Sequence, residues 1–223
     1  MSKRLSRKEI REDPFLTAVV EGWEWIRDHQ NSVFVVLIVV LVLVLGGFWL
    51  NGSRKGARME AVGQFAEGLS SYRGGDLSTA DDIFALVVER YGGFREGAWS
   101  HYFIGSIALL QGRNDDAIEA FDRYLDESRK YPFYRDAAKA GKATALENER
   151  RYEEAAELYL ALATRPETNG FMNGLYLERA AENFELAQRI DKAIATYEQL
   201  LDETSGVEKR DIETKLELSL IHI

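Results

Sequence analysis

The chain has 223 residues, with 28 Lys and Arg against 37 Asp and Glu, so its formal net charge at pH 7 is −9. This acidic excess argues against the phosphate backbone of a nucleic acid as a partner. The chain contains no cysteine, which excludes disulfides, thiolate catalysis and cysteine metal sites.

Residues 1–31 are predicted to form a basic arm followed by an amphipathic helix. Asp13-Pro14 is typical of a helix start, because Asp is a good N-cap and Pro suits the first helical position. Two interpretations of the apolar face of this helix stay open. It lies in the membrane interface, with Trp23 and Trp25 at the level of the lipid headgroups, or it docks onto another membrane subunit. The apolar residues at helical spacing are Phe15, Leu16, Val19, Val20, Trp23 and Ile26.

Residues 32–50 contain an uncharged apolar stretch of 18 residues, Val33–Leu50. As a helix this stretch would be about 27 Å long, close to the roughly 30 Å hydrocarbon core of a bilayer. Because a lone segment in lipid has to satisfy its own backbone hydrogen bonds, we expect a transmembrane helix. Trp49, Leu50 and Asn51 stand where a cleavable signal peptide would need small residues, so we expect a retained anchor.

The basic residues that flank the stretch predict its orientation. Six Lys and Arg precede it, whereas three (Arg54, Lys55 and Arg58) lie in the 20 residues that follow. Since Lys and Arg are enriched on the cytoplasmic side, we expect the N-terminus in the cytoplasm and the larger, acidic part outside.

Two further features belong to the predicted anchor. Gly46 and Gly47 would allow close helix contact in lipid, and Trp49 would lie at the membrane surface. We expect the membrane or a partner subunit to contact these three residues and the apolar face of the preceding helix, through Phe15, Val19, Trp23 and Ile26. Asn51, Gly52, Ser53 and Gly56 predict a short hinge at 51–56.

Residues 57–206 contain an internal repeat with four units. Alanines recur at intervals of 37, 38 and 38 residues, each followed four positions later by an aromatic residue and preceded twelve positions earlier by a small one. Such a unit is a helix, a turn and an antiparallel helix, with the small residues where the helices cross and the aromatic ring in the groove toward the next unit. The alanines are Ala80, Ala117, Ala155 and Ala193, the aromatic residues Phe84, Phe121, Tyr159 and Tyr197, and the earlier small residues Gly68, Gly105, Ala143 and Ala181. We therefore predict an all-α solenoid, closed by a capping helix within 207–223.

This repeat resembles the tetratricopeptide repeat, most closely in the unit with Gly105, Gly112, Ala117 and Phe121. Its period exceeds the family's 34 residues, and the third and fourth units lack the turn glycine. A cytoplasmic arm, one span and an exported repeat domain together resemble the ancillary subunit of the SecYEG translocon. That resemblance implies a single-pass protein of the bacterial inner membrane with a periplasmic repeat domain. Its implied partners are other membrane-protein subunits, the lipid bilayer and exported polypeptides.

The sequence offers no constellation for catalysis. His29, His101 and His222 lie in unrelated places without metal-ligand spacing. Acidic pairs such as Asp115-Asp116 fall in the first turn of a predicted helix, where carboxylates complement the helix dipole. We expect a binding protein and not an enzyme, with no catalytic residue, metal, cofactor or small-molecule substrate.

Aromatic residues beside the connections between repeats are candidates for a partner surface, because such residues are enriched at interfaces. They are Tyr131, Phe133, Tyr134, Phe171 and Tyr176. The alternative, which we favour, is that they fill the wider gaps between these long repeats. A rival function also stays open: a fixed structural accessory subunit of a large photosynthetic or respiratory membrane complex, stabilising it through the span and the interfacial helix.

Overall fold

The structure, a computed structural model, describes residues 14–165, 170–203 and 207–221. The predicted arm at 1–13 lies outside the described residues. The chain divides into two compact units, Met1–Gly56 and Ala57–Ile223. The described helices are α1 (Pro14–Asp28), α2 (Gln30–Arg73), α3 (Leu77–Tyr91), α4 (Arg95–Leu110), α5 (Asn114–Glu127), the 3₁₀ turn η2 (Pro132–Tyr134), α6 (Arg135–Asn148), α7 (Tyr152–Ala163), α8 (Gly170–Leu186), α9 (Ile190–Glu203) and α10 (Val207–Ile221).

The first unit consists of α1 and the beginning of α2. Val19, Trp23 and Ile26 of α1 are all exposed, whereas the side chain of Phe15 lies outside the described residues. Between the two helices, the ring of His29 stacks on Trp25 with ring centroids 4.9 Å apart. The apolar part of α2 is long and apolar enough to cross a membrane, by length and composition, and none of it is buried within the protein.

The predicted hinge at 51–56 is helical instead. The helix α2 continues through these residues from Gln30 to Arg73. Glycine costs about 1 kcal/mol in a helix interior. Extending a helix that already exists costs far less than starting a new one, so the helical sequence on both sides keeps the glycines in the helix. The division between the two compact units nevertheless falls directly after Gly56.

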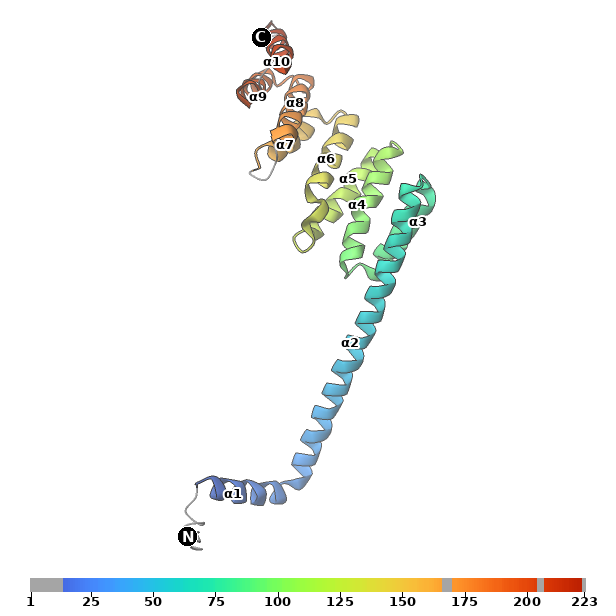
Figure 1. Ribbon diagram of the computed structural model, residues 1–223, viewed down its shortest axis with the longest axis vertical. Coiled ribbons are helices and arrows are strands. Elements are labelled where there is room, and N and C mark those ends of the chain that lie inside the picture. Colours follow the sequence, from blue (N-terminus) through green and yellow to red (C-terminus); the bar gives the residue numbers. More distant parts are fainter. Residues whose placement is uncertain (1–13, 166–169, 204–206, 222–223) are drawn as a thin grey trace, which may run out of the picture. The chain divides into compact units, whose positions relative to one another are not determined.

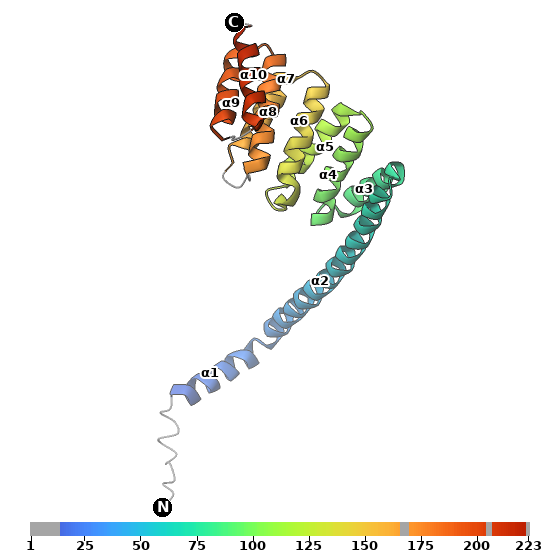
Figure 2. The same cartoon turned by 45° about the horizontal axis from the view of Figure 1, so that its top comes forward.

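The second unit is an all-helical tetratricopeptide-like solenoid, as the repeat predicted. Residues 57–73 of α2 pack on α3, and α4 pairs with α5, α6 with α7, and α8 with α9. Consecutive helices from α3 to α10 lie side by side in both views (Figures 1 and 2). The helix α10 packs against α9 through Ile212, which is buried, and Leu216.

These four hairpins turn in the same way. A residue with positive φ stands two positions after the end of the first helix in each: Gly75 (83°), Gly112 (73°), Arg150 (59°) and Gln188 (59°). The next backbone N–H then donates to a carbonyl five residues back, as from Arg113 to Ala108 and from Arg151 to Leu146, both at 2.8 Å. Units three and four therefore keep the left-handed turn without the glycine that favours it.

The small residues of the first two repeats leave no room for a larger side chain, and the atoms nearest to them belong to an aromatic ring of the facing helix. A Cβ added at Gly105 would lie 2.8 Å from Cδ1 of Phe121, and one added at Gly68 would lie 2.9 Å from Cε1 of Phe84. In these two repeats the small residue thus makes room for the aromatic ring of its own unit. For Phe121 the predicted position of the ring toward the next unit is confirmed, because a Cβ at Gly141 of α6 would lie 2.6 Å from Cζ of this ring.

Candidate protein-binding surfaces

An aromatic cluster joins the second and third repeats. The ring of Tyr134 stacks on Tyr102 of α4, with centroids 4.5 Å apart and planes 3° from parallel. Tyr134 also meets Trp99 and Phe103 edge-on, at 5.5 and 5.3 Å. Burial raises the pKa of the Tyr134 hydroxyl. Since aromatic pairs add stability beyond the area that they bury, Tyr134 is part of the packing between repeats.

The connection before α6 is fixed by one buried hydroxyl. Tyr124 donates to the backbone carbonyl of Tyr131 at 2.8 Å and accepts from the backbone N–H of Tyr134 at 2.9 Å. Phe133, between these anchored positions, stays 76% exposed. The packing interpretation therefore fits Tyr134, and Phe133 is the residue of this loop that offers an uncovered ring.

Phe133 is accompanied by two residues that were not predicted from the sequence, Trp99 and Arg95. Trp99 lies 5.9 Å from its ring, and the guanidinium of Arg95 lies 4.4 Å above the Trp99 ring. The indole N–H of Trp99 is buried and has no acceptor within the described part of the chain. The spacing of Trp99 and Tyr102, one helical turn apart, was the available sign of a shared face. We call Arg95, Trp99, Tyr102, Phe133 and Tyr134 the aromatic surface.

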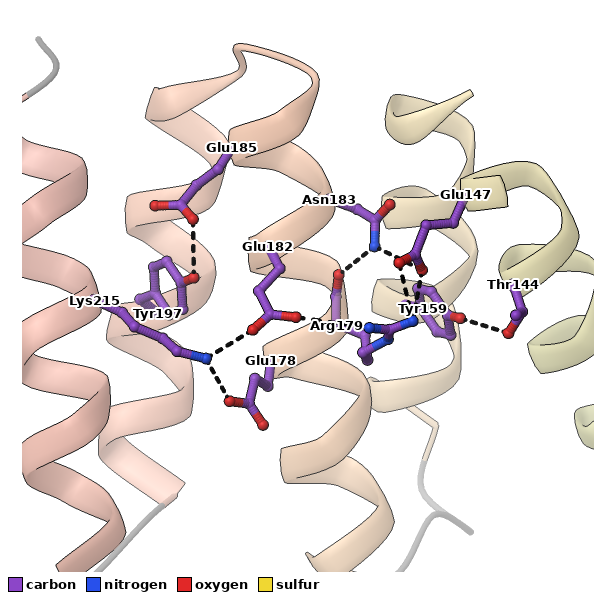
Figure 3. A network of polar contacts seen from close by, with 10 residues as sticks. All are labelled: Thr144, Glu147, Tyr159, Glu178, Arg179, Glu182, Asn183, Glu185, Tyr197 and Lys215. Carbon is purple, nitrogen blue, oxygen red and sulfur yellow. Dashed lines mark hydrogen bonds and ion pairs between the residues drawn. The ribbon is translucent and has the colours of Figure 1, made fainter. Parts of the chain in front are cut away.

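In the last two repeats, charged side chains add to the apolar packing. Arg179 of α8 donates to both carboxylate oxygens of Glu147 of α6, at 3.0 and 2.8 Å. Lys215 of α10 pairs with Glu178 and Glu182 of α8, each at 2.7 Å. Figure 3 shows these contacts as one network from α6 to α10. Such pairs fix how successive first helices lie against one another.

The other predicted aromatic pair lies in this region. Tyr176 is half-buried and stacks on Tyr159 with centroids 6.3 Å apart, so it contributes to packing. The side chain of Phe171 lies outside the described residues. Asn183 is buried and donates to Glu147 at 3.2 Å and to the carbonyl of Arg179 at 2.9 Å.

His101 lines a cavity of about 330 Å³ but lacks a catalytic arrangement in the described residues. Its Nε2 is 3.9 Å from Glu127, and two other carboxylates lining the cavity already pair with arginines: Asp116 with Arg113, and Glu119 with Arg123. Burial, aided by the charge of Arg123, holds the pKa of His101 below its usual value. Among the described residues, no three His, Asp or Glu side chains gather closely enough to hold a metal ion.

Comparisons with known proteins agree with this geometry. Residues 65–135 match the tetratricopeptide repeat family. A crystal structure of a putative kinesin light chain from Podosopora anserina, with nearly identical TPR-like repeats, resembles this chain with a TM-score of 0.53 at 16% identity. That likeness covers 73% of this chain and 85% of the other. The crystal structure of a single-residue variant of the same protein gives a TM-score of 0.52 with the same identity and coverage.

A comparison with curated proteins found no match. At 16% identity the structural likeness concerns the fold alone. Together with the family match over residues 65–135 and the repeat geometry, it identifies the second unit as a tetratricopeptide-like solenoid.

Proposed function

We propose that this protein is a membrane-anchored scaffold whose repeat solenoid binds other proteins beside the bacterial inner membrane. The observation that carries the proposal is the combination, in one chain, of an uncovered apolar helix with a tetratricopeptide-like solenoid. An apolar stretch of this length in which no residue is buried is unfavourable in water and stable in lipid.

The helix α1 adds a second membrane contact. Its exposed Val19, Trp23 and Ile26 suit the headgroup region, where tryptophan is enriched, or the flank of a neighbouring subunit. Gly46, Gly47 and Trp49 of α2 are equally uncovered, because a Cβ at either glycine would touch nothing and Trp49 is 72% exposed.

The finer proposal concerns place and partner. The excess of Lys and Arg before the apolar stretch supports a cytoplasmic N-terminus and a periplasmic solenoid. In that arrangement the chain would act as an ancillary subunit of translocation or assembly machinery. The aromatic surface would bind exported polypeptides or a neighbouring subunit, with Phe133 as the exposed contact.

Protease treatment tests the topology. In intact spheroplasts that express the full chain, we expect added protease to degrade the solenoid and to leave the N-terminal arm protected. A solenoid that stays protected until the cells are lysed would overturn the periplasmic placement. Recovery of the chain in the soluble fraction would overturn the anchor.

Site-specific crosslinking tests the binding role. A photoreactive residue at Phe133 should crosslink to a membrane subunit or an exported polypeptide, whereas one at Leu110, 65% exposed but outside the aromatic surface, should not. Equal crosslinking from both positions would contradict a role for the aromatic surface. Stoichiometric, salt-resistant co-purification with pigments or haem would instead establish a fixed accessory subunit of an energy-converting complex.

A further inference from the structure

The aromatic surface belongs to the edge of the solenoid at which the repeat unit begins. Ala57, the first residue of the second unit, packs against a buried cluster that includes Tyr91 of α3. Phe94, directly before α4, packs against the same cluster, and the hydroxyl of Tyr91 donates to Glu60 of α2 at 3.0 Å. The solenoid part of α2 and the helix α4 therefore begin beside each other.

Ring contacts extend this edge to the connection before α6. Phe94 is followed by Arg95, whose guanidinium lies 4.4 Å above the ring of Trp99. The ring of Trp99 lies 5.9 Å from Phe65 of α2 and also 5.9 Å from Phe133. One tryptophan thus separates the exposed Phe133 from α2.

The chain reaches this edge directly from the apolar stretch. Ala57 follows Leu50 by seven residues, and α2 is helical throughout them. Seven residues span about 10 Å as a helix, and at most about 25 Å when fully extended. If the apolar stretch crosses a membrane, Ala57 stands close to the bilayer surface, and the aromatic surface begins at the same edge of the solenoid.

The connection before α6 is basic, although the whole chain has a net charge of −9. Residues 128–135 contain Arg129, Lys130 and Arg135 but no Asp or Glu. Arg129 and Lys130 are exposed, and neither pairs with a carboxylate in the described part of the chain. Arg135 donates to the neutral hydroxyl of Ser128 at 3.3 Å.

The carboxylates beside this connection are engaged elsewhere. Asp136 pairs with Arg165, and Glu127 lies 3.9 Å from Nε2 of His101. Glu96 of α4 is buried and accepts hydrogen bonds from the arginine that precedes it. Among the described residues, Arg129 and Lys130 therefore have no counter-charge, and an acidic group would complement them.

We propose that the aromatic surface binds an acidic segment of a neighbouring membrane subunit, at the point where that segment leaves the bilayer. This inference rests on the proposed function and names the partner of the same surface. A carboxylate of the segment meets Arg129 and Lys130, and a large apolar side chain packs on Phe133. Because the hydroxyl of Tyr124 holds the backbone on both sides of Phe133, little ordering is needed when the segment binds.

Crosslinking from a photoreactive residue at Phe133, in native membranes with the full chain, identifies the partner. We expect the product to contain a membrane subunit, joined at an acidic segment next to one of its transmembrane helices. A product with an exported polypeptide would overturn this partner and leave the proposed binding role intact. A product with lipid, or with a second copy of this chain, would also overturn the inference. No product at all would remove the binding role itself.

Charge reversal tests the acidic character of the partner. Arg129→Glu should lower the crosslinking yield from Phe133 by about threefold or more, because it replaces attraction with repulsion. Arg210→Glu makes the same change at an exposed arginine of α10 and should leave the yield unchanged. Circular dichroism and the thermal midpoint should equal those of the wild type for both variants, which separates a lost contact from a lost fold.

Added salt gives an independent readout. Sodium chloride at about 0.5 M should lower the yield of the wild type and change that of Arg129→Glu much less, since ions screen exposed charges. Equal yields for the wild type and Arg129→Glu, or equal salt dependence, would overturn the acidic partner. When the partner carboxylate has been identified, its replacement by lysine should restore the yield of Arg129→Glu. Failure of this rescue would contradict a direct contact.

Discussion

The ring of Phe121 lies so close to Gly141 that a Cβ at residue 141 would be 2.6 Å from Cζ of the ring. Gly105 faces the same ring, and a Cβ there would be 2.8 Å from Cδ1. One side chain of α5 therefore determines how closely the first helices of two successive repeats approach. The spacing between these two repeats therefore depends on glycine at both positions, because neither residue carries a Cβ.

Alanine at either glycine should destabilise the solenoid. We expect Gly141→Ala and Gly105→Ala each to lower the free energy of unfolding by about 1–3 kcal/mol, because the tightly packed ring has to move. Gly63→Ala is the matched control, since a Cβ there would touch nothing and alanine favours the helix by roughly 0.5–1 kcal/mol. Urea unfolding measures all three. Additive effects of Gly141→Ala and Phe121→Leu would show that the ring is not the cause.

Glycine at the left-handed turns of repeats three and four should stabilise them. The left-handed conformation costs a residue with a side chain roughly 1–2 kcal/mol. For glycine, the freedom that it loses on folding costs roughly 0.5–1 kcal/mol. Arg150→Gly and Gln188→Gly should therefore raise the free energy of unfolding by up to about 1 kcal/mol. Ala187→Gly, at a neighbour without positive φ, should lower it. Destabilisation by both turn variants would refute the shared turn geometry.

Phe133 and Tyr134 should separate binding from folding. Phe133→Ser removes a ring that is 76% exposed, so we expect the stability to change by less than about 0.5 kcal/mol while partner crosslinking falls. Tyr134→Ala removes the ring that stacks on Tyr102 and should cost about 2–4 kcal/mol. Thermal unfolding and crosslinking yield give the two readouts. Wild-type crosslinking by the Phe133 variant would remove this residue from the binding surface.

His101 should make stability depend on pH. Burial, with help from Arg123, holds its pKa in the folded protein below the usual value of 6.5, so the unfolded chain binds the proton more readily. The free energy of unfolding should fall as the pH drops below about 6.5 and level off once the pH is below the folded pKa. His101→Gln should flatten this part of the profile. Identical slopes for the variant and the wild type between pH 7 and 5 would contradict the shift.

The repeat architecture could be predicted because residues of the same type recur at a fixed spacing and pack in the same way in each repeat. The helical period and the repeat interval of 37 or 38 residues predict that Ala117 and Phe121 lie in the core. In the structure, Ala117 is fully buried and Phe121 is 1% exposed. Local patterns were less informative about what a position touches. Gly105 suggested a close helix crossing, but only the coordinates show that it faces the ring of Phe121.

Other features depend on distant parts of the chain and had no local sign. The stack of Tyr134 on Tyr102 joins residues from different repeats, and Arg179 reaches Glu147 across 32 positions of sequence. The predicted hinge failed for a related reason. Glycine weakens a helix locally, but the sequence on both sides decides whether the helix continues.

Apolar clusters pack every repeat of the solenoid, and the further contacts that are added to them differ along the chain. Rings such as Tyr102 and Tyr134 join the early repeats, whereas the charges of Arg179, Glu147 and Lys215 join the late ones (Figure 3). Raising ionic strength weakens attraction between charges, and salting-out anions such as sulfate strengthen the burial of rings. A saltier environment therefore favours the ring contacts of the early repeats over the charged contacts beside α10.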